Sequence, residues 1–385
     1  MKKNLLLAAM AAAAMTSCSN DDVIEVNQGK GITFRASIDN PLTRGTVTKQ
    51  ADLTEFKVTA IGNGESYFKD LLVNGGPTNW TPSATYYWPN YQLDFFAYAP
   101  VSPSGTVTID NGSKKIEGFT SGTDVAAQKD LLISYNKGTK AKNETSGVTL
   151  NFKHALSQIE VKAKNGNTNM DIQVIGVKLV GAGSKGDFTF PEEETTASKA
   201  VPQNKWTNVT ENDHSKAYMV KGDAAVTLTA DAQSIMFGTD NNIFVIPQKL
   251  TAWTNNTART GAYLSVLCRI STKGTDGSTT LIYPQPAVGD PKTDKYAFSA
   301  VAIDTNWEPG KKYIYTLNFC DPTTGSGAGR IDPNPTVPGG TDTSVDSTVP
   351  AGSKPGDTIL GAAIKYTVTV DEWKDQVVSP DPKLD

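Results

Sequence analysis

The sequence feature that most constrains the fold is a period-2 alternation of apolar and polar residues, which recurs in short segments along the chain. Its clearest form lies in residues 31–39, where Ile32, Phe34, Ala36 and Ile38 alternate with polar side chains. This alternation is typical of a β-strand with one buried face. The chain has no long segment with helical apolar spacing, and its 33 Gly and 21 Pro provide turns between short strands. The sequence therefore predicts an all-β protein.

An exposed loop is expected directly after this first strand. Asn40-Pro41 ends the alternation, because proline has no backbone N–H to donate to a strand ladder. Arg44 and Gly45 follow in a polar stretch that we expect to be accessible.

A second segment near the end of the chain repeats the pattern of the first. In IKYTVTVD, the residues Ile364, Tyr366, Val368 and Val370 fall on the apolar positions of ITFRASID when the two are aligned without gaps. Two strands so alike could occupy the same groove. We therefore hypothesise that the chain polymerises, with the second strand of one copy replacing the first strand of another. The sequence does not determine the direction of the incoming strand.

The first residues indicate export. In residues 1–17, two lysines precede an apolar run that is too short to span a membrane, which is typical of a secretory signal. The next residue, Cys18, completes a stretch that resembles the lipobox of bacterial lipoproteins, in which this cysteine is lipidated. Residues 19–22, with the sequence SNDD, resemble the short acidic tag that directs such lipoproteins to the cell surface in Bacteroides-type bacteria. The alternative is an ordinary signal peptide with an incidental cysteine.

The strand pattern predicts two β-sandwiches in series. The first is expected over residues 45–140, with residues 31–39 as its edge strand. A polar, turn-rich stretch at 137–147 is the predicted boundary, and the second sandwich is expected over 148–320.

The next segment has a different composition. In residues 321–358, Pro, Gly, Ser, Thr and Asp make up 29 of 38 residues, so we expect a flexible tether with a span of about 35 Å. Such a tether would carry a C-terminal appendage, residues 359–385, to a neighbouring molecule. The alternative is that the strand in this appendage folds back on its own domain, because the entropy cost of closing a loop grows slowly with length.

Chemistry typical of enzymes is missing from the sequence. The two histidines, His154 and His214, lie in no recognisable metal or nucleophile motif, and no phosphate-binding loop is present. The acidic run Glu192 to Glu194 follows a proline and is expected to be a solvated loop. We therefore expect no metal, no cofactor and no enzymatic activity. With 36 basic and 40 acidic residues and no basic run, nucleic acid is not an expected partner.

Two further features leave alternatives open. The aromatic run ATYYWPNYQLDFFAYAP, residues 84–100, is either a stacking platform for sugars or part of a sandwich core, and the large area of these rings favours the core. Cys268 and Cys320 are the cysteines left once Cys18 is lipidated. An exported protein permits a disulfide between them, but no sequence argument establishes one.

Several segments, taken in order, resemble a known family. The stretches YYWPNYQLDFFAYAP, DLLISY, VTLNFKHALSQIEVKAK, FVIPQ and WEPGKKYIYTLNF are similar to recurrent motifs of fimbrillin-like proteins, the type V pilin superfamily of Bacteroides-type bacteria. The pair Glu372-Trp373 after the last strand is similar to the C-terminal end of the major fimbrial subunits in that family.

This resemblance implies an outer-membrane lipoprotein precursor with two transthyretin-like β-sandwich domains. It also implies that an arginine-specific surface protease cuts after Arg44, releasing a propeptide of residues 18–44 with the first strand and the lipid. A C-terminal strand from the next subunit then fills the open groove. The implied partners are other copies of the chain, accessory fimbrial subunits, the protease, the outer membrane and host or bacterial surface receptors. The alternatives are a fimbrial anchor, a tip adhesin or a surface glycan-binding lipoprotein.

Overall fold

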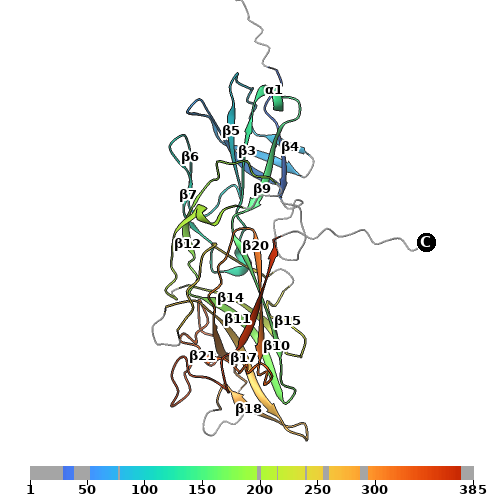
Figure 1. Cartoon of the computed structure of the whole chain (residues 1–385), viewed down its shortest axis with the longest axis vertical. Coiled ribbons are helices and arrows are strands. Elements are labelled where there is room, and N and C mark those ends of the chain that lie inside the picture. Colours follow the sequence, from blue (N-terminus) through green and yellow to red (C-terminus); the bar gives the residue numbers. More distant parts are fainter. Residues whose placement is uncertain are drawn as a thin grey trace, which may run out of the picture.

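The computed structural model describes residues 29–38, 53–76, 79–196, 201–214, 216–238, 241–254, 260–286 and 294–373. These residues form two β-rich halves that follow one another along the long axis of the molecule (Figure 1). Among them, helical structure is limited to α1 (Lys140–Asn143) and two short 3-10 turns, Val125–Ala127 and Gln203–Lys205. The prediction of an all-β protein is confirmed.

The upper half in Figure 1 is built on a seven-stranded sheet, in the order β1-β9-β8-β5-β2-β3-β4. Its strands are β1 (Phe34–Ile38), β2 (Glu55–Gly62), β3 (Glu65–Gly76), β4 (Asn79–Pro82), β5 (Leu93–Ala99), β8 (Leu132–Gly138) and β9 (Val148–His154). One face of this sheet surrounds an apolar core that includes all four apolar side chains of the first predicted strand.

A smaller, four-stranded sheet covers the other face of the upper half. Its order is β13-β12-β7-β6. The strands are β6 (Thr106–Ile109), β7 (Lys114–Thr120), β12 (Lys185–Thr189) and β13 (Trp206–Thr210). Aromatic side chains from the two sheets form a second core, in which Phe96 of β5 packs against Tyr135 of β8 and Phe190.

The lower half is a sandwich of a six-stranded and a five-stranded sheet around the largest apolar core. The six-stranded sheet holds β11 (Met170–Val180), β14 (Ala217–Thr227), β17 (Tyr263–Lys273), β18 (Thr279–Tyr283), β19 (Ala297–Ala302) and β21 (Arg330–Ile331). The five-stranded sheet holds β10 (Ser157–Asn165), β15 (Gln233–Ser234), β16 (Ile243–Val245), β20 (Lys311–Phe319) and β22 (Lys365–Glu372).

The expected boundary at 137–147 is corrected by the position of β9. Val148, which we expected to begin the second sandwich, opens β9, and β9 pairs with β1 and β8 in the seven-stranded sheet. The polar stretch before it forms α1 and the turn that joins β8 to β9. The chain enters the lower half only between β9 and β10, after His154. A polar stretch is therefore a connection within the first sheet rather than a boundary.

The expected tether is also corrected, because residues 321–358 are folded against the six-stranded sheet. We call these residues the extension. Within it, β21 pairs with β19, and Val345 forms a bridge with Tyr296. Asp332 is completely buried. The extension is therefore part of the lower half and does not act as a flexible coil in this structure.

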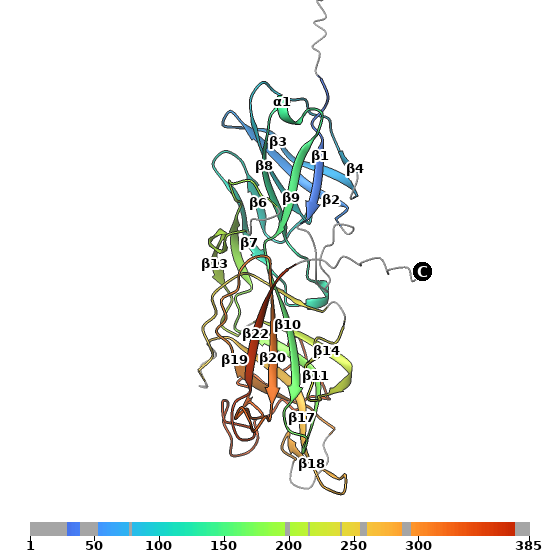
Figure 2. The same cartoon turned by 45° about the vertical axis from the view of Figure 1, so that its right-hand side comes forward.

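The C-terminal strand β22 folds back on its own half of the chain. It pairs antiparallel with β20 along its whole length and forms the edge of the five-stranded sheet. This arrangement matches the alternative in which the strand returns to its own domain. The structure therefore holds both of the related strands within one chain (Figure 2), β1 in the upper half and β22 in the lower half.

Candidate functional site

The first strand lies at one edge of the seven-stranded sheet with its apolar face in the core. Ile32, Phe34, Ala36 and Ile38 are between 4% and 7% exposed. Phe34 packs edge-on against two core rings, at 5.9 Å and 6.2 Å between ring centroids. We call the place that residues 31–38 occupy the β1 slot. Its floor is apolar, and its occupant is a single strand.

The backbone and the polar face of this strand are held mainly by β9. The two strands run parallel, with Phe34 opposite Val148. Ser37 Oγ donates to Asn151 Oδ1 at 2.8 Å. The start of the strand is also held on its other edge, by an antiparallel bridge between Gly31 and Tyr87. Beside this bridge, the N–H of Ile32 donates to the carbonyl oxygen of Tyr86 at 2.7 Å. Removing the strand would therefore expose the hydrogen-bonding edge of β9 beside the apolar core.

The second related strand is held less completely. Ile364 is buried, but Tyr366 and Val368 are only partly buried against the lower core, and Val370 is 52% exposed. One edge of β22 pairs with β20, and its C-terminal end is tied by an ion pair between Glu372 and Lys311. β22 thus leaves apolar side-chain surface exposed to solvent, whereas the apolar side chains of β1 are all buried.

A buried indole ends this strand at the junction of the two halves. The ring of Trp373 stacks on His154, with 4.2 Å between centroids and 7° between planes, and lies 5.1 Å from the ring of Phe244. His154 Nδ1 is 2.6 Å from the carboxylate of Asp130, and both side chains are buried. We call His154, Phe244 and Asp130 the Trp373 socket. His154 therefore has a packing role in this structure.

Sequence reasoning did not find this socket. Trp373 was noted only as a family feature after the last strand. The signal that could have located it is the combination of a histidine at the end of one strand, His154, with a tryptophan directly after another. Their contact depends on how the two halves are joined, which the sequence pattern does not reveal.

A buried ion pair fixes the extension to the lower half. Lys178 Nζ lies 3.0 Å from Asp332 Oδ2, and neither side chain is more than 1% exposed. Asp332 also accepts hydrogen bonds from the hydroxyls of Tyr263 at 2.9 Å and Ser265 at 2.5 Å. Burial lowers the pKa of Lys178 below its ordinary value, while the carboxylate of Asp332 acts in the opposite direction. We call this pair the clamp.

A second, more exposed contact holds the middle of the extension. Lys221 Nζ donates to Asp342 Oδ2 at 2.6 Å, and Ser344 donates to the other oxygen of the same carboxylate. The hydrogen bond from Lys221 is the main reason that the pKa of Asp342 is lowered to about 2. The extension is therefore anchored at two separate places along its length.

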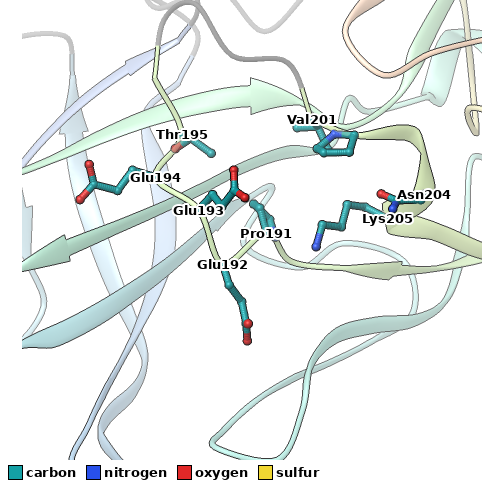
Figure 3. Close-up of a pocket in the computed structure, with 9 residues that line it drawn as sticks. Pro191, Glu192, Glu193, Glu194, Thr195, Val201, Asn204 and Lys205 are labelled. Carbon is teal, nitrogen blue, oxygen red and sulfur yellow. The ribbon is translucent and has the colours of Figure 1, made fainter.

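The acidic run at Glu192 to Glu194 lines a cavity of about 370 Å³ together with Thr195, Lys205 and neighbouring residues (Figure 3). All three glutamates are exposed, as expected for a solvated loop. The carboxyl groups of Glu192 and Glu194 point away from one another, and Glu192 forms an ion pair with Lys114 at 3.2 Å. This geometry does not form a pair of carboxylates facing a common substrate.

The remaining candidates from the sequence are mostly structural. In the aromatic run, Trp88, Phe95, Phe96 and Tyr98 are buried, whereas Tyr87 is exposed. The sugar-platform interpretation therefore has little support.

Both cysteines in the described part, Cys268 and Cys320, are buried and free. Burial raises the pKa of both thiols, that of Cys320 to about 11.

Three predicted processing residues, Cys18, Arg44 and Gly45, lie outside the described residues. Within the ranges that are described, no group of three or more His, Cys, Asp or Glu side chains is placed to hold a metal ion. The same ranges contain no helix that is long and apolar enough to cross a membrane.

Comparison with known proteins gives a family and a fold. A family model described as fimbrillin-like matches residues 35–333. The structure is similar to that of a fimbrial protein from Bacteroides vulgatus, with a TM-score of 0.55 and 16% identity over 90% of this chain and 100% of that one. A candidate cell adhesion protein from Bacteroides ovatus aligns with a TM-score of 0.45 and 14% identity, over 91% of this chain and 99% of the other. No protein of curated function matches.

Proposed function

Because the chain belongs to the fimbrillin-like family, we propose that it is a structural subunit of a cell-surface fimbria that polymerises by strand exchange. In this proposal β1 is removed from each copy, and the C-terminal strand of the adjacent copy takes its place in the β1 slot. Fimbrial subunits act by assembly, so the proposed role is not enzymatic.

The observation that carries the proposal is the relation between β1 and β22. Both are edge strands of their sheets, and their apolar residues coincide when the sequences are aligned. An edge with unpaired backbone groups beside an apolar trough accepts a strand of matching pattern. The β1 slot would become such an edge when its strand leaves.

The exchange is favourable for the incoming strand. In the aligned register Val368 takes the place of Ala36, which adds about 1.6 kcal/mol at roughly 0.8 kcal/mol for each additional buried carbon group. Val370, which is 52% exposed on its own sheet, takes the place of Ile38, which is buried. Strand transfer therefore buries apolar surface that the free chain leaves in water.

The proposed maturation begins with a lipoprotein precursor anchored through Cys18 and cut after Arg44. Arg35 is the competing arginine, but it lies within β1, where its guanidinium donates to Thr149 at 2.9 Å. Paired backbone is a poor protease substrate, which supports a cut in the loop at Arg44. The corresponding partners are an arginine-specific surface protease, the outer membrane, accessory subunits and surface receptors.

A role in the shaft fits better than a role at either end of the fimbria. A tip subunit needs no strand to donate, whereas this chain carries β22. An anchor needs no cut, whereas this chain offers Arg44 in a predicted loop. We therefore place the protein in the shaft.

The test is limited trypsin treatment of the purified precursor followed by electrophoresis without boiling. We expect a cut after Arg44 and a ladder of oligomers that heat dissociates. Arg44→Ala should abolish the ladder, while the matched variant Arg35→Ala should retain it. Deleting residues 358–385 should leave cleavage intact and stop elongation. A precursor that is cut at Arg44 and remains monomeric at high concentration would contradict the proposal.

A further inference from the structure

We propose that the incoming strand enters the β1 slot parallel to β9 and places its Trp373 in the Trp373 socket of the accepting copy. This inference rests on the proposed strand exchange. The same socket would then hold the chain's own indole before assembly and a neighbour's indole after it.

The first step of the argument is the length of the donor arm. The clamp holds Asp332, and the carbonyl oxygen of Asp357 accepts from the N–H of Ile331 in β21 at 2.9 Å. Residues 359–363 are bonded more loosely to the segment before β21, through backbone hydrogen bonds of 3.0–3.2 Å that reach as far as Ala363. If the clamp and the bond at Asp357 persist while the bonds of residues 359–363 break, the arm that can leave starts near residue 359. Residues 359–363 then form the only connector before Ile364, and five extended residues reach at most about 18 Å.

The second step is the direction in which the two strands run. β1 begins at the far end of the upper half and runs toward the junction of the halves, and β22 begins in the lower half and also runs toward the junction (Figure 2). When β22 detaches and turns about residues 359–363, it points out of the lower half, away from its own junction. It can then enter the slot of a copy stacked end to end, starting at the outer end of that slot.

With end-to-end stacking and a connector of residues 359–363, an antiparallel strand does not reach its place in the slot. Its first residues would have to enter the β1 slot at the junction, at the inner end. The slot from residue 32 to residue 38 is about 20 Å long at roughly 3.3 Å per residue. The connector would have to pass along this whole length in addition to crossing between copies, which exceeds its reach of about 18 Å.

The third step is the register. Ile38 lies opposite Phe152 of β9, and Val370 takes the place of Ile38 in the gapless match. Trp373 then lies three residues beyond this point, and His154 lies two residues beyond Phe152 on the neighbouring strand. The incoming indole is thus delivered beside His154. In this proposal a copy inside the fibre has donated its own β22, so its socket is open to the incoming indole.

The polar face of the slot supports the same register. Ser37 donates to Asn151 Oδ1 in the free chain. In the parallel register Thr369 replaces Ser37, so one hydroxyl replaces another at this position. An antiparallel strand over the same residues would instead bring Lys365 to Asn151.

The Trp373 socket can hold the indole of either copy, because its main contacts are made through ring faces. The imidazole of His154 and the ring of Phe244 both stack on the indole. Among the described residues, Trp373 Nε1 has no hydrogen-bond partner, so no directional bond ties the indole to its own chain. An indole delivered along β9 by another copy meets the same surfaces.

The test is disulfide crosslinking in assembled, processed full-length chains. The variant Asn151→Cys with Thr369→Cys should give oligomers linked covalently under mild oxidation. The matched variant Asn151→Cys with Lys365→Cys should give at least tenfold less crosslink. Single-cysteine variants control for Cys268 and Cys320, which are buried. Preferential crosslinking through position 365 would overturn the inference while leaving strand exchange intact.

The socket itself is tested by a pair of substitutions in the same assay. Trp373→Ala and His154→Ala should each lower the temperature at which the oligomer ladder dissociates. The double variant should dissociate at the same temperature as the less stable single variant, because both substitutions remove the same ring contact. Additive losses would refute a shared contact in the assembled fibre. If processed wild-type chains form no oligomers at all, strand exchange fails first, and this inference falls with it.

Discussion

The clamp gives the sharpest stability prediction. Asp332→Ala removes the carboxylate and leaves the ammonium of Lys178 buried, 3.7 Å from the ring centroid of Phe298 and with only carbonyl oxygens as polar partners. Removing one partner of a buried ion pair costs about 3–5 kcal/mol, because the remaining charge is uncompensated. We expect a loss of this size in the free energy of unfolding.

A double substitution separates the charge from the packing. Lys178→Met combined with Asp332→Leu removes both charges and retains apolar volume, so no uncompensated charge stays buried. Like Asp332→Ala, it leaves the hydroxyls of Tyr263 and Ser265 without their acceptor, so the two variants differ mainly in the buried charge. The double variant should therefore be clearly more stable than Asp332→Ala. As a control, Lys273→Met removes a surface pair with Asp171 at 3.9 Å and should cost less than about 1 kcal/mol.

The assay is urea unfolding together with hydrogen exchange of the extension. Asp332→Ala should speed exchange at β21 more than at β11, because the clamp joins the extension to a central strand. It should also lengthen the donor arm and so reduce the preference for crosslinking at position 369. A cost below about 1 kcal/mol for Asp332→Ala would refute the reasoning, since it would mean that the ion pair is hydrated or absent.

Three further predictions follow from the packing and the titrating groups. Phe34→Ala should lower the free energy of unfolding by about 3–5 kcal/mol, measured in urea, because a buried ring leaves a cavity; a loss below 1 kcal/mol would contradict its place in the core. The lowered pKa of Asp342 means that the stability conferred by Lys221 is present above the ordinary carboxyl pKa and is lost as pH falls through about 2. The destabilisation caused by Lys221→Met, measured in urea, should therefore shrink between pH 4 and pH 2. A destabilisation that stayed constant over this range would refute the contact. Cys268 and Cys320 should resist iodoacetamide at pH 8 in the native protein and react in urea, and rapid native labelling would show that they are not buried.

The sequence predicts the strands better than their partners. The alternation at Ile32 to Ile38 correctly marks a strand with one buried face, and the alternation at Ile364 to Val370 correctly marks β22. The pairing of β1 with β9 joins segments more than a hundred residues apart and leaves no local signal. For this reason the polar stretch between β8 and β9 was misread as a boundary between domains.

The extension shows why composition alone can mislead. Its Gly, Pro, Ser, Thr and Asp content predicts a flexible coil. In the structure its aspartates organise turns, since Asp332, Asp342 and Asp346 each accept a hydrogen bond from the backbone N–H two residues later. The recurring Asp-x-Asn/Ser/Thr pattern was readable from the sequence. The burial of Asp332 against Lys178 was not, because it depends on the position of β11.

The parallel ladder between β1 and β9 has a mechanical consequence for a fibre assembled as proposed. The ladder lies along the long axis of the molecule (Figure 2), and its hydrogen bonds cross from strand to strand at even spacing. Tension on a chain of stacked copies would therefore pull a donated strand lengthwise through its slot. In this shear geometry the hydrogen bonds share the force and must break together, whereas a strand pulled sideways would unzip one bond at a time.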